Sequence, residues 1–573
     1  MTSYRLQNGG LIDRQASLSF SFDGKRMVGF EGDSLASALL ANGQLLVGRS
    51  FKYHRPRGIL TAGAAEPNAL MTIGEGGRTE PNTRATMQEL YQGLEAKSQN
   101  RWPSLEFDIG SLNSLLSPFL GAGFYYKTFM WPAPFWEKVY EPFIRKAAGL
   151  GKASYEADPD TYEKCWAHCD LLVIGAGPAG LAAALTAGRS GARVILADEH
   201  STIGGSLLSD TATIGGATAS DFVSQSRVEL ESLPNVRVLD RTTVFGWYDG
   251  NVFGAVERVQ KHVALPKAEV PVERLWRIAA KQALLATGAE ERPLVFGGND
   301  TPGVMMAGAM RTYLNRYGVA PGREVAIFTT NDSGYALALD LEAGGIVPVA
   351  IIDSRSEGSN IYSGRARVIE GAFVSDAKGG KALSSIEISK NGGRETLKVD
   401  ALAVAGGFSP IIHLACHRGG PPVWSDEQGT FLAPENLIGM QLAGSVLGVS
   451  SIADSLAEGA AKASVMVSNM GFSVSPASFG TVEGDIAAQA RPAKVLWTIP
   501  GVKGKAFVDY QNDVHRKDLG LAVQEGYGHV ELAKRYTTNG MATDQGKLSN
   551  VNAIGLLAEA RGVSPADVGT TTF

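Results

Sequence analysis

Residues 170–185, Asp-Leu-Leu-Val-Ile-Gly-Ala-Gly-Pro-Ala-Gly-Leu-Ala-Ala-Ala-Leu, constrain the fold of this chain most strongly. An apolar run, a glycine-rich turn and an alanine-rich run predict a buried strand, a tight turn and a helix. Gly175, Gly177 and Gly180 have the G-x-G-x-x-G spacing: the first permits the turn, the second admits a pyrophosphate and the third lets helix and strand pack closely. We therefore expect a dinucleotide at the start of this helix.

The residues that follow complete this pattern. Arg193–Ala197 predicts a second strand, which ends at Asp198 and Glu199. An acidic residue about 20 positions past the glycines accepts hydrogen bonds from a ribose diol, and it disfavours NADP, whose extra phosphate prefers an arginine. Because strand, turn, helix and acid are all present, we favour a dinucleotide site over a glycine turn without a ligand.

Size and composition bound the remaining possibilities. A chain of 573 residues is too long for one core, so several domains are expected. The net charge of −5 and the absence of a basic tail argue against a nucleic-acid partner. The first residues form no apolar signal core, and Pro118 and Lys127 interrupt the most membrane-like run, Leu112–Met130, so no membrane association is expected. Only three cysteines indicate a reducing compartment, and we expect a cytoplasmic protein without a metal site.

The N-terminal part predicts a small β-grasp, ferredoxin-like domain over residues 1–105. Ser17–Phe22 and Lys25–Phe30 flank an Asp-Gly turn, and a helix over Leu35–Asn42 follows. The next segment, Arg49–Gly63, is basic and carries interleaved aromatic residues, so it could hold a phosphate or an acidic partner surface, or be a solvated face. Its cationic residues are Arg49, Lys52, His54, Arg55 and Arg57.

A connecting region rich in aromatic residues and proline covers residues 106–168. Pro132 and Pro134 break any regular helix there, whereas Glu137–Leu150 could form an amphipathic helix. So many aromatic side chains suggest that this region packs on another domain or subunit.

A second Rossmann-like unit begins near residue 322. Val325–Phe328 predicts a strand and Tyr335–Glu342 a helix, but Thr329, Asn331 and Gly334 stand in the three glycine positions. Side chains at the first two positions would crowd a pyrophosphate, so this lobe keeps the fold without binding a dinucleotide in the usual way. The strand Ala401–Ala405 closes the lobe.

The predicted fold is therefore α/β: a two-dinucleotide-binding-domain flavoprotein-like Rossmann fold with an N-terminal β-grasp domain and a small C-terminal helical module. We expect the dinucleotide-binding lobe at 169–300 and 436–475, the degenerate lobe at 301–435 and the helical module at 495–573. The module's expected helices are Lys517–Glu525 and His529–Tyr536. The helix Ser450–Ser464 returns to the first lobe.

The sequence also bears on the type of cofactor and on catalysis. Flavin-binding relatives of this fold have Gly-Asp where this chain has Gly444-Ser445, which favours NAD over FAD. Cys165 and Cys169 lack further ligands nearby and are taken as incidental thiols just before the first strand. Cys416 and His417 would point to opposite faces of a strand, so they are not expected to act as nucleophile and base. No catalytic residue is predicted.

Four further segments, together with the glycine turn, make the chain resemble the alpha subunits of heterotetrameric sarcosine oxidases along nearly its whole length. Unlike the glycine turn, these four segments are specific to that family. They are Arg49–Gly63, Thr329–Ser333, Val508–Asp513, and Arg535–Thr538 together with Thr543–Lys547.

The resemblance implies a function in a larger complex. In that family the enzyme oxidatively demethylates sarcosine to glycine with formation of hydrogen peroxide. The beta subunit carries FAD, FMN lies at the alpha–beta interface, and gamma and delta subunits complete the tetramer. The alpha subunit holds NAD, and tetrahydrofolate binds in a C-terminal aminomethyltransferase-like domain. This chain ends where that domain would begin, so folate binding is not assigned to its residues.

The resemblance also carries over site residues. The expected NAD contacts are Gly175, Ala176, Gly177, Ala179, Gly180, Asp198, Glu199, His200, Gly205, Ser206, Val244, Thr287, Gly288, Ala443, Gly444 and Leu447. For FMN the candidates are the turn Thr329–Ser333 and the basic segment near Lys52. Related amine dehydrogenase subunits hold a cysteine-ligated iron–sulfur cluster in the β-grasp domain or the helical module. No cysteine precedes Cys165 or follows Cys416, so we expect no cluster.

Two alternatives stay open. The chain could be a free-standing NAD(P)H- or FAD-dependent oxidoreductase, or the alpha subunit of a related N-methyl amino acid or opine dehydrogenase. A disulfide reductase would need a Cys-x-x-Cys or similar pair, and the sequence has none.

Overall fold

The computed structural model describes residues 4–147, 150–357, 361–475, 477–489 and 493–570. These residues form two compact units. The first unit combines residues 1–158, 291–407 and 493–570, and the second combines 159–290 and 408–492. Each unit has its own hydrophobic core. No helix of the described residues is both long enough and apolar enough to span a membrane.

The second unit is built on a seven-stranded sheet in the order β12-β9-β8-β15-β14-β13, with β28 also pairing with β15. Two 13-residue strands, β8 and β15, run in parallel at its centre. The strands of this sheet are β8 (Tyr162–Ile174), β9 (Val194–Ala197), β12 (Val236–Leu239), β13 (Thr242–Tyr248), β14 (Val252–Arg258), β15 (Glu273–Leu285) and β28 (Met440–Leu442).

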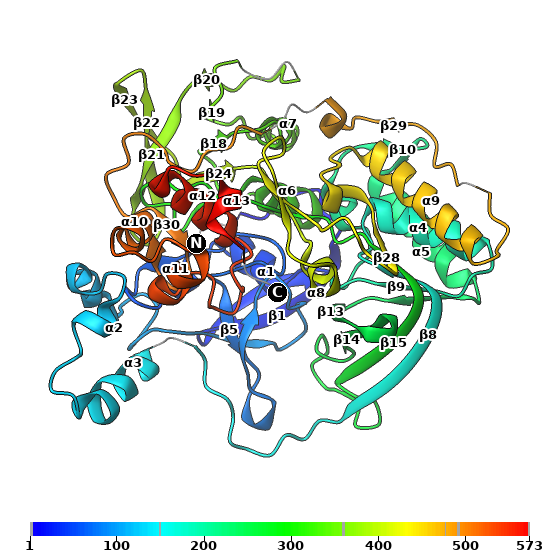
Figure 1. The fold of residues 1–573 in the computed structure, drawn as a ribbon, viewed down its shortest axis with the longest axis horizontal. Coiled ribbons are helices and arrows are strands. Elements are labelled where there is room, and N and C mark those ends of the chain that lie inside the picture. The colour runs from blue at the N-terminus through cyan, green and yellow to red at the C-terminus, as the bar shows by residue number, and fades with distance from the viewer. Residues whose placement is uncertain (1–3, 148–149, 358–360, 476, 490–492, 571–573) are drawn as a thin grey trace. The chain divides into compact units, whose positions relative to one another are not determined.

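Three helices of this unit, α4 (Pro178–Arg189), α5 (Ala219–Ser232) and α9 (Ile452–Asn469), lie side by side (Figure 1). Ten of the twelve residues of α4 are buried, most of them alanine, leucine or glycine. Such small side chains let α9 approach α4 so closely that a Cβ on Gly459 would overlap the backbone of Ala179. The expected strand–turn–helix is thus present, and it is central to this core.

The first unit begins with the expected β-grasp domain. Its five-stranded sheet has the order β2-β1-β7-β5-β6, with β1 and β7 parallel. Ser34 caps the helix α1 (Leu35–Ala41), all of whose residues are buried. The strands are β1 (Asp13–Phe22), β2 (Lys25–Glu31), β5 (Leu70–Ile73), β6 (Glu80–Arg84) and β7 (Glu95–Ser98).

The degenerate Rossmann-like lobe belongs to the same unit. Five parallel strands lie in the order β17-β24-β18-β19-β20, with α6 (Ala307–Tyr317) and α7 (Ser333–Ala343) beside them. The strands are β17 (Val304–Met306), β18 (Val325–Thr329), β19 (Ala350–Asp353), β20 (Val368–Glu370) and β24 (Ala401–Ala405). An antiparallel sheet that we did not predict follows β20, formed by β21 (Phe373–Gly379), β22 (Leu383–Lys390) and β23 (Gly393–Lys398).

The helical module also lies in the first unit. It contains the two expected helices, α10 (Arg516–Gln524) and α11 (Val530–Thr537), and the longer α12 (Asn550–Arg561), which we did not predict. The short strands β30 (Phe507–Asp509) and β31 (Val514–His515) precede α10. In the connecting region, the expected helix at Glu137–Leu150 is replaced by a π-helical turn at Trp136–Tyr140 and α3 (Glu141–Ala147), and its residues 148–149 lie outside the described ranges.

Two predicted boundaries are corrected by the structure. The strand before the glycine turn, β8, begins at Tyr162 rather than near residue 169, because its N-terminal half pairs with β15. Cys165 and Cys169 therefore lie within β8 rather than before it. Residues from 408 onward join the dinucleotide-type unit rather than the degenerate lobe, since the helix α8 (His413–Gly419) packs on β13.

Candidate functional site

The glycine turn has the geometry that its spacing predicts. Gly175 has a left-handed backbone (φ +96°), and its N–H donates to the carbonyl of Ala197 at 2.8 Å. A Cβ on Gly180 would overlap the carbonyl oxygen of Gly175, so the third glycine is required for packing. A Cβ on Gly177 would meet nothing within 4 Å, so the second glycine instead leaves open space beside the turn.

Asp198 is buried and organises this turn. Its carboxylate accepts hydrogen bonds from the backbone N–H of Ala176 (2.7 Å) and of His200 (2.8 Å). The His200 Nδ1 lies 3.1 Å from the same carboxylate. Burial alone would raise the pKa of Asp198, but the bonds from His200 and Ala176 outweigh it and leave the pKa below its usual value. The carboxylate is thus ionised and joins the end of β9 to the glycine turn.

Glu199 and His200 follow on the surface. Both are partly exposed, and Arg258 donates to the backbone carbonyl of Glu199 at 2.5 Å. Within the described residues the Glu199 carboxylate has no hydrogen bond or ion pair. Of the two predicted ribose ligands, Glu199 is therefore the one whose carboxylate is fully available.

A second loop closes against the first. The N–H of Gly204 donates to the carbonyl of Ala176 at 2.8 Å, and a Cβ on Gly205 would lie 2.9 Å from the Cα of Gly177. Gly205 and Ser206 are exposed at the edge of the open space. On the other side, the N–H of Thr242 donates to the carbonyl of Asp198 at 2.7 Å, which places the partly exposed Val244 near the end of β9.

The remaining predicted contacts gather at the ends of neighbouring parallel strands. Thr287 and Gly288 follow β15, whose neighbour Ala286 donates to the carbonyl of Ile174 at 2.8 Å. Ala443 donates to the carbonyl of Leu285 at 3.0 Å, and a Cβ on Gly444 would lie 2.9 Å from the Cβ of Ala179. Leu447 ends the helical turn Gly444–Leu447. The structure therefore brings the predicted residues together at one edge of the sheet, where open α/β folds bind ligands.

The sequence did not point to Glu458, which lies behind this edge. Its carboxylate accepts a hydrogen bond from the N–H of Gly444 at 2.7 Å and pairs with Lys462 at 2.9 Å. The N–H of Gly444 is thus already used within the chain. This hydrogen bond joins residues 14 positions apart, so the spacing of residues in the sequence could not predict it.

The turn of the second lobe is filled by its own side chains. Thr329 Oγ1 bonds with the backbone of Asn331, and Asn331 Oδ1 accepts from the N–H of Ser333. At the end of β19, where a ribose acid would stand, Arg355 pairs with Asp353 (2.8 Å) and Asp332 (2.7 Å). Residues 329–332 are buried, which agrees with a lobe that binds no dinucleotide and makes this turn a poor FMN candidate.

Most cationic side chains of the basic segment Arg49–Gly63 already bind other residues of the same unit. Arg49 donates to the carbonyl of Leu105, and His54 lies 2.7 Å from Asp108. Arg55 forms two hydrogen bonds with Asp300, at 2.6 and 2.8 Å. The fully buried Arg57 pairs with both Asp300 and Asp513. Of the alternatives left open for this segment, neither a ligand site, a partner surface nor a solvated face describes these four side chains, because carboxylates and carbonyls of the same unit bind them.

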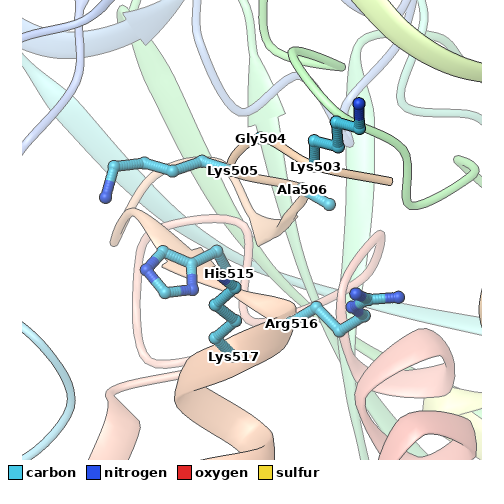
Figure 2. A pocket seen from close by; sticks show the side chains of 7 residues that line it. All are labelled: Lys503, Gly504, Lys505, Ala506, His515, Arg516 and Lys517. Atoms are coloured by element: carbon cyan, nitrogen blue, oxygen red, sulfur yellow. The ribbon is translucent and has the colours of Figure 1, made fainter. Parts of the chain in front are cut away.

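Lys52 is the exception, and it lies close to a basic cavity. Its ammonium group lies 4.8 Å from the centre of the Tyr53 ring, and Lys505 lies 4.4 Å from the same centre. Lys505 lines a cavity of about 240 Å³ (Figure 2). The lining residues are Lys503, Gly504, Lys505, Ala506, His515, Arg516 and Lys517. The Lys-x-Lys and His-Arg-Lys runs were the sequence signal for this cavity, and we missed it.

The cysteines offer no catalytic arrangement. Cys416 and His417 lie on the helix α8 and not on a strand, so our reason for excluding this pair was wrong. Burial raises the pKa of Cys416 to about 11 and that of Cys169 to about 12, so both are protonated thiols at neutral pH. The His417 Nδ1 accepts a hydrogen bond from the N–H of Trp247 at 3.3 Å. Within the described ranges, no group of three or more His, Cys, Asp or Glu side chains could hold a metal ion.

Three family models match parts of the chain. Residues 503–573 match the sarcosine oxidase A3 domain, and residues 169–320 match the pyridine nucleotide-disulphide oxidoreductase family. Residues 15–101 match a 2Fe-2S iron-sulfur cluster binding domain. The last match contradicts our expectation that the chain carries no iron–sulfur cluster. The matched span holds no cysteine, which a cluster uses as its ligand, so its residues do not fit the usual ligand set and we derive no reaction step through a cluster.

Comparisons over the whole chain agree with the match to the sarcosine oxidase A3 domain. The chain is 72% identical over all its 573 residues to "Sarcosine oxidase subunit alpha" of Rhizobium meliloti (strain 1021), and it spans 58% of that relative. It is 38% identical to the subunit of the same name from Corynebacterium sp. (strain P-1), spanning 57% of it. Among solved structures, L-proline dehydrogenase from P. horikoshii matches 99% of this chain and 97% of its own, with a TM-score of 0.68 and 21% identity, which shows a shared fold.

Proposed function

We propose, from the premise that this chain belongs to the family of sarcosine oxidase alpha subunits, that it holds NAD and forms one side of an FMN site in a multi-subunit enzyme. That enzyme would oxidatively demethylate sarcosine to glycine and form hydrogen peroxide. The chain spans a little over half the length of the relatives it matches. The proposed activity therefore belongs to the assembled enzyme, of which this oxidoreductase subunit is one part.

One observation carries the NAD proposal. The open space at Gly177 lies beside a turn whose other two glycines are fixed by packing, and the predicted NAD residues surround it. Backbone N–H groups at the start of α4 would bind the pyrophosphate, and the carboxylate of Glu199 would bind the adenosine ribose. Asp198 would hold the turn in shape through Ala176 while accepting a second ribose hydrogen bond.

The edge near Gly444 supports NAD over FAD. The N–H of Gly444 is bound to Glu458, and the next residue is Ser445 rather than an aspartate. The chain thus offers neither a free amide nor a carboxylate for a flavin side chain at this position. In this proposal NAD is a structural ligand, as the resemblance to the family implies.

The connecting region supports the proposal that this chain binds another subunit. A stretch that we call the apolar segment, residues 102–139, carries eleven exposed large apolar side chains, with Trp131 at 83% and Leu115 at 78% exposure. These side chains are Trp102, Phe107, Ile109, Leu112, Leu115, Leu116, Phe119, Met130, Trp131, Phe135 and Val139. So large a set of exposed apolar groups is typical of a protein interface.

Polar contacts fix this segment to its own unit. Ser114 donates to the carbonyl of Tyr53 at 2.8 Å, Ala122 donates to Asp518 at 2.9 Å, and Lys127 pairs with Glu525 at 2.5 Å. The backbone is therefore held while the apolar side chains face outward. We assign this face to a different subunit of the enzyme.

We place FMN at the border near Lys52. FMN, when bound, would supply the transfer to oxygen of the electrons that the FAD of the beta subunit removes from the amine. The residues present fit its charge, because Lys52 and the basic cavity lie in one cluster with Tyr53, whose hydroxyl donates to Leu120 of the apolar segment at 3.3 Å. The chain's own contribution would be to bind and orient the cofactor, with the partner subunit covering its other side.

Purification of the chain alone tests the NAD proposal. We expect a colourless protein that releases one equivalent of NAD on denaturation, measured by chromatography of the supernatant. A yellow protein that oxidises NADH by itself would instead support a free-standing oxidoreductase. Asp198→Ala should release the NAD and lower the melting temperature, because a ligand that binds only the folded state stabilises it.

A further inference from the structure

The N-terminal half of the strand β8 forms an open edge of its sheet. β15 pairs with β8 from Tyr162 to Ile174 (Figure 1), whereas β9 pairs only with residues 171–174. Residues 163–169, which we call the β8 edge, therefore have a neighbouring strand on one side only within the described part of the chain. At about 3.3 Å per residue they span about 23 Å, which is the length of an ordinary strand.

The two outer strands of the same sheet are protected against further pairing, and the β8 edge is not. At one end of the sheet, β12 is only four residues long. At the other end, the pairing of β13 is irregular between Val244 and Gly246, and the helix α8 packs on this strand. Short strands, bulges and covering helices are the usual means by which proteins block an edge. The β8 edge is longer than β12, keeps one register with β15 and contains no proline.

One face of the β8 edge is exposed, and the other face holds the strand in place. Lys164, Trp166 and His168 are exposed, whereas Ala167 and Cys169 are buried. Trp166 is 59% exposed, and tryptophan is among the residues enriched at protein interfaces. The buried side chains fix the strand in its sheet, so the backbone groups on its open side are held ready for a further strand.

Two unbalanced cations lie on the exposed face. Arg277, on β15, stacks on Trp166, with its guanidinium carbon 5.3 Å from the centre of the ring. Lys164 lies two residues before Trp166 on the same face of β8. Neither Arg277 nor Lys164 forms an ion pair among the residues that the structure describes. Their charges are therefore available to a group from outside the chain.

Two ion-pair groups beside the β8 edge offset each other. Their members are Asp170 with Arg193 and Lys281, and Arg274 with Glu163 and Glu257. The first group holds one carboxylate between two cations, and the second holds one cation between two carboxylates. Neither group balances Lys164 and Arg277, so the face beside the β8 edge is complementary to acidic side chains.

We propose that the β8 edge binds an extended acidic segment of another subunit, which adds a strand to this sheet. Main-chain hydrogen bonds to the open side of residues 163–169 supply the affinity, as in other cases of strand addition. Acidic side chains of the segment pair with Lys164 and Arg277, and an apolar side chain packs on the exposed part of the Trp166 ring. That the partner is a subunit of the same enzyme rests on the proposed function.

Hydrogen–deuterium exchange tests the added strand directly, in the isolated full chain and in the complex with its co-expressed subunits. We expect peptides that cover residues 163–169 to exchange at least about tenfold more slowly in the complex, because a paired amide exchanges only when the strand detaches. Peptides that cover β18, a central strand of the other unit, are the control and should exchange equally in both samples. Equal exchange of the β8 edge in both samples would overturn the proposal.

A charge-matched pair of variants tests the acidic character of the partner. Lys164→Glu with Arg277→Glu reverses the two unbalanced charges, and Lys390→Glu with Lys398→Glu reverses two exposed lysines of the antiparallel sheet. Circular dichroism melting verifies that both variants fold. We expect the first variant to lose the protection of the β8 edge and to bind the partner subunits at least about tenfold more weakly, and the second to match the unmodified chain. Equal effects in both variants would refute an acidic partner.

The oxidation of sarcosine by the unmodified complex separates this inference from the proposed function. If the complex is active and the β8 edge is unprotected, strand addition is refuted and the proposed function stands. If the edge is protected in a complex that does not oxidise sarcosine, strand addition stands and the proposed activity is refuted. Protection in the isolated chain, together with the mass of two copies, would overturn the acidic partner and identify a second copy as the occupant.

Discussion

Two adjacent acids divide the work of the proposed dinucleotide site. Asp198 is buried and bonded to the turn, whereas Glu199 is partly exposed with a free carboxylate among the described residues. Glu199→Gln should weaken NAD binding about tenfold or more, the value of one charge-assisted hydrogen bond, with little change in the melting temperature of the apoprotein. Titration of the apoprotein with NAD measures the first effect and thermal unfolding the second.

Asp198→Ala is the contrasting variant. It leaves two backbone N–H groups without partners, each costing about 1–3 kcal/mol of folding free energy. A variant at position 199 that is as unstable as the one at 198 would contradict this division of roles.

The three glycines of the turn also separate into a proposed ligand position, Gly177, and two packing positions, Gly175 and Gly180. Gly177→Ala should fold normally and bind NAD weakly, since its Cβ would project into the open space. Gly180→Ala should fail to fold or unfold at a much lower temperature, because its Cβ would overlap the carbonyl of Gly175. Circular dichroism melting and NAD content, measured on both, check this, and equal melting temperatures would refute the distinction.

At the residue scale, the sequence allowed prediction where the interaction is local. The spacing of Gly175, Gly177 and Gly180 defines a single turn, so their roles follow from backbone geometry. The inward orientation of Asp198 and the bond from Gly444 to Glu458 depend on tertiary packing, which no local pattern encodes.

At the scale of elements, the basic segment joins other parts of its unit. Arg57 is fully buried between Asp300 and Asp513, which lie 243 and 456 residues away in sequence. Arg57→Ala should cost about 3–5 kcal/mol, because two buried carboxylates each lose one cationic partner. Urea unfolding of the chain measures this. The exposed pair of Arg145 with Glu141 is the control, and Arg145→Ala should leave the unfolding curve unchanged.

The buried Asp509, at the end of β30, predicts an effect of pH on stability. Burial and the neighbouring Asp544 raise the pKa of Asp509 to about 7, and burial raises that of Asp544 as well. Because the folded state holds the proton more tightly than the unfolded state, this stability is full below about pH 4 and is lost as the pH rises through 7.

Asp509→Asn should remove that part of the slope of melting temperature against pH, since the amide does not titrate. The variant should lose most relative to the unmodified chain at pH 5 and least at pH 8. A slope between pH 4 and 7 that is the same in both proteins would show that Asp509 ionises normally. Asp210→Asn, at a surface turn of the other unit, serves as the control.

Elements with a clear period were predictable, and those fixed by context were not. The strands β2 and β24 and the helices α7, α10 and α11 lie within about two residues of their predicted places, whereas β1 begins four residues earlier than predicted. Cys416 and His417 were read as part of a strand because short apolar runs fit either structure, and packing against β13 selects the helix. The sheet of β21, β22 and β23 was missed, although buried Ile386 and Ile388 alternate with less buried residues in β22.

At the scale of the whole molecule, the apolar segment implies an incomplete assembly. Leu115→Asp with Trp131→Asp should leave the chain folded, because both side chains are exposed, and should reduce its co-purification with partner subunits at least tenfold. Ile438→Asp, an equally exposed position in the other unit, is the control. Size-exclusion chromatography of the co-expressed proteins measures the complex. Self-association that disappears in the double variant would instead identify a second copy of this chain as the partner.

The grouping of domains into units could not be read from the sequence. Composition marks the β-grasp domain, the degenerate lobe and the helical module separately, and only the buried contacts among residues such as Arg57, Asp300 and Asp513 make them one unit. The iron–sulfur expectation failed for a related reason. We argued from the missing cysteines alone, whereas the family match rests on the pattern of the whole domain.

The buried Arg57 also has a consequence for biogenesis. A ribosome that adds about 5–20 residues per second needs roughly 25–90 s to pass from Arg57 to Asp513. The guanidinium lacks both carboxylates until Asp300 is synthesised and lacks Asp513 until the end of that interval, and most of the other unit, residues 159–290, is synthesised in the meantime. The first unit can therefore complete its core only late in translation. A stalled or prematurely terminated nascent chain would expose it to proteases and chaperones.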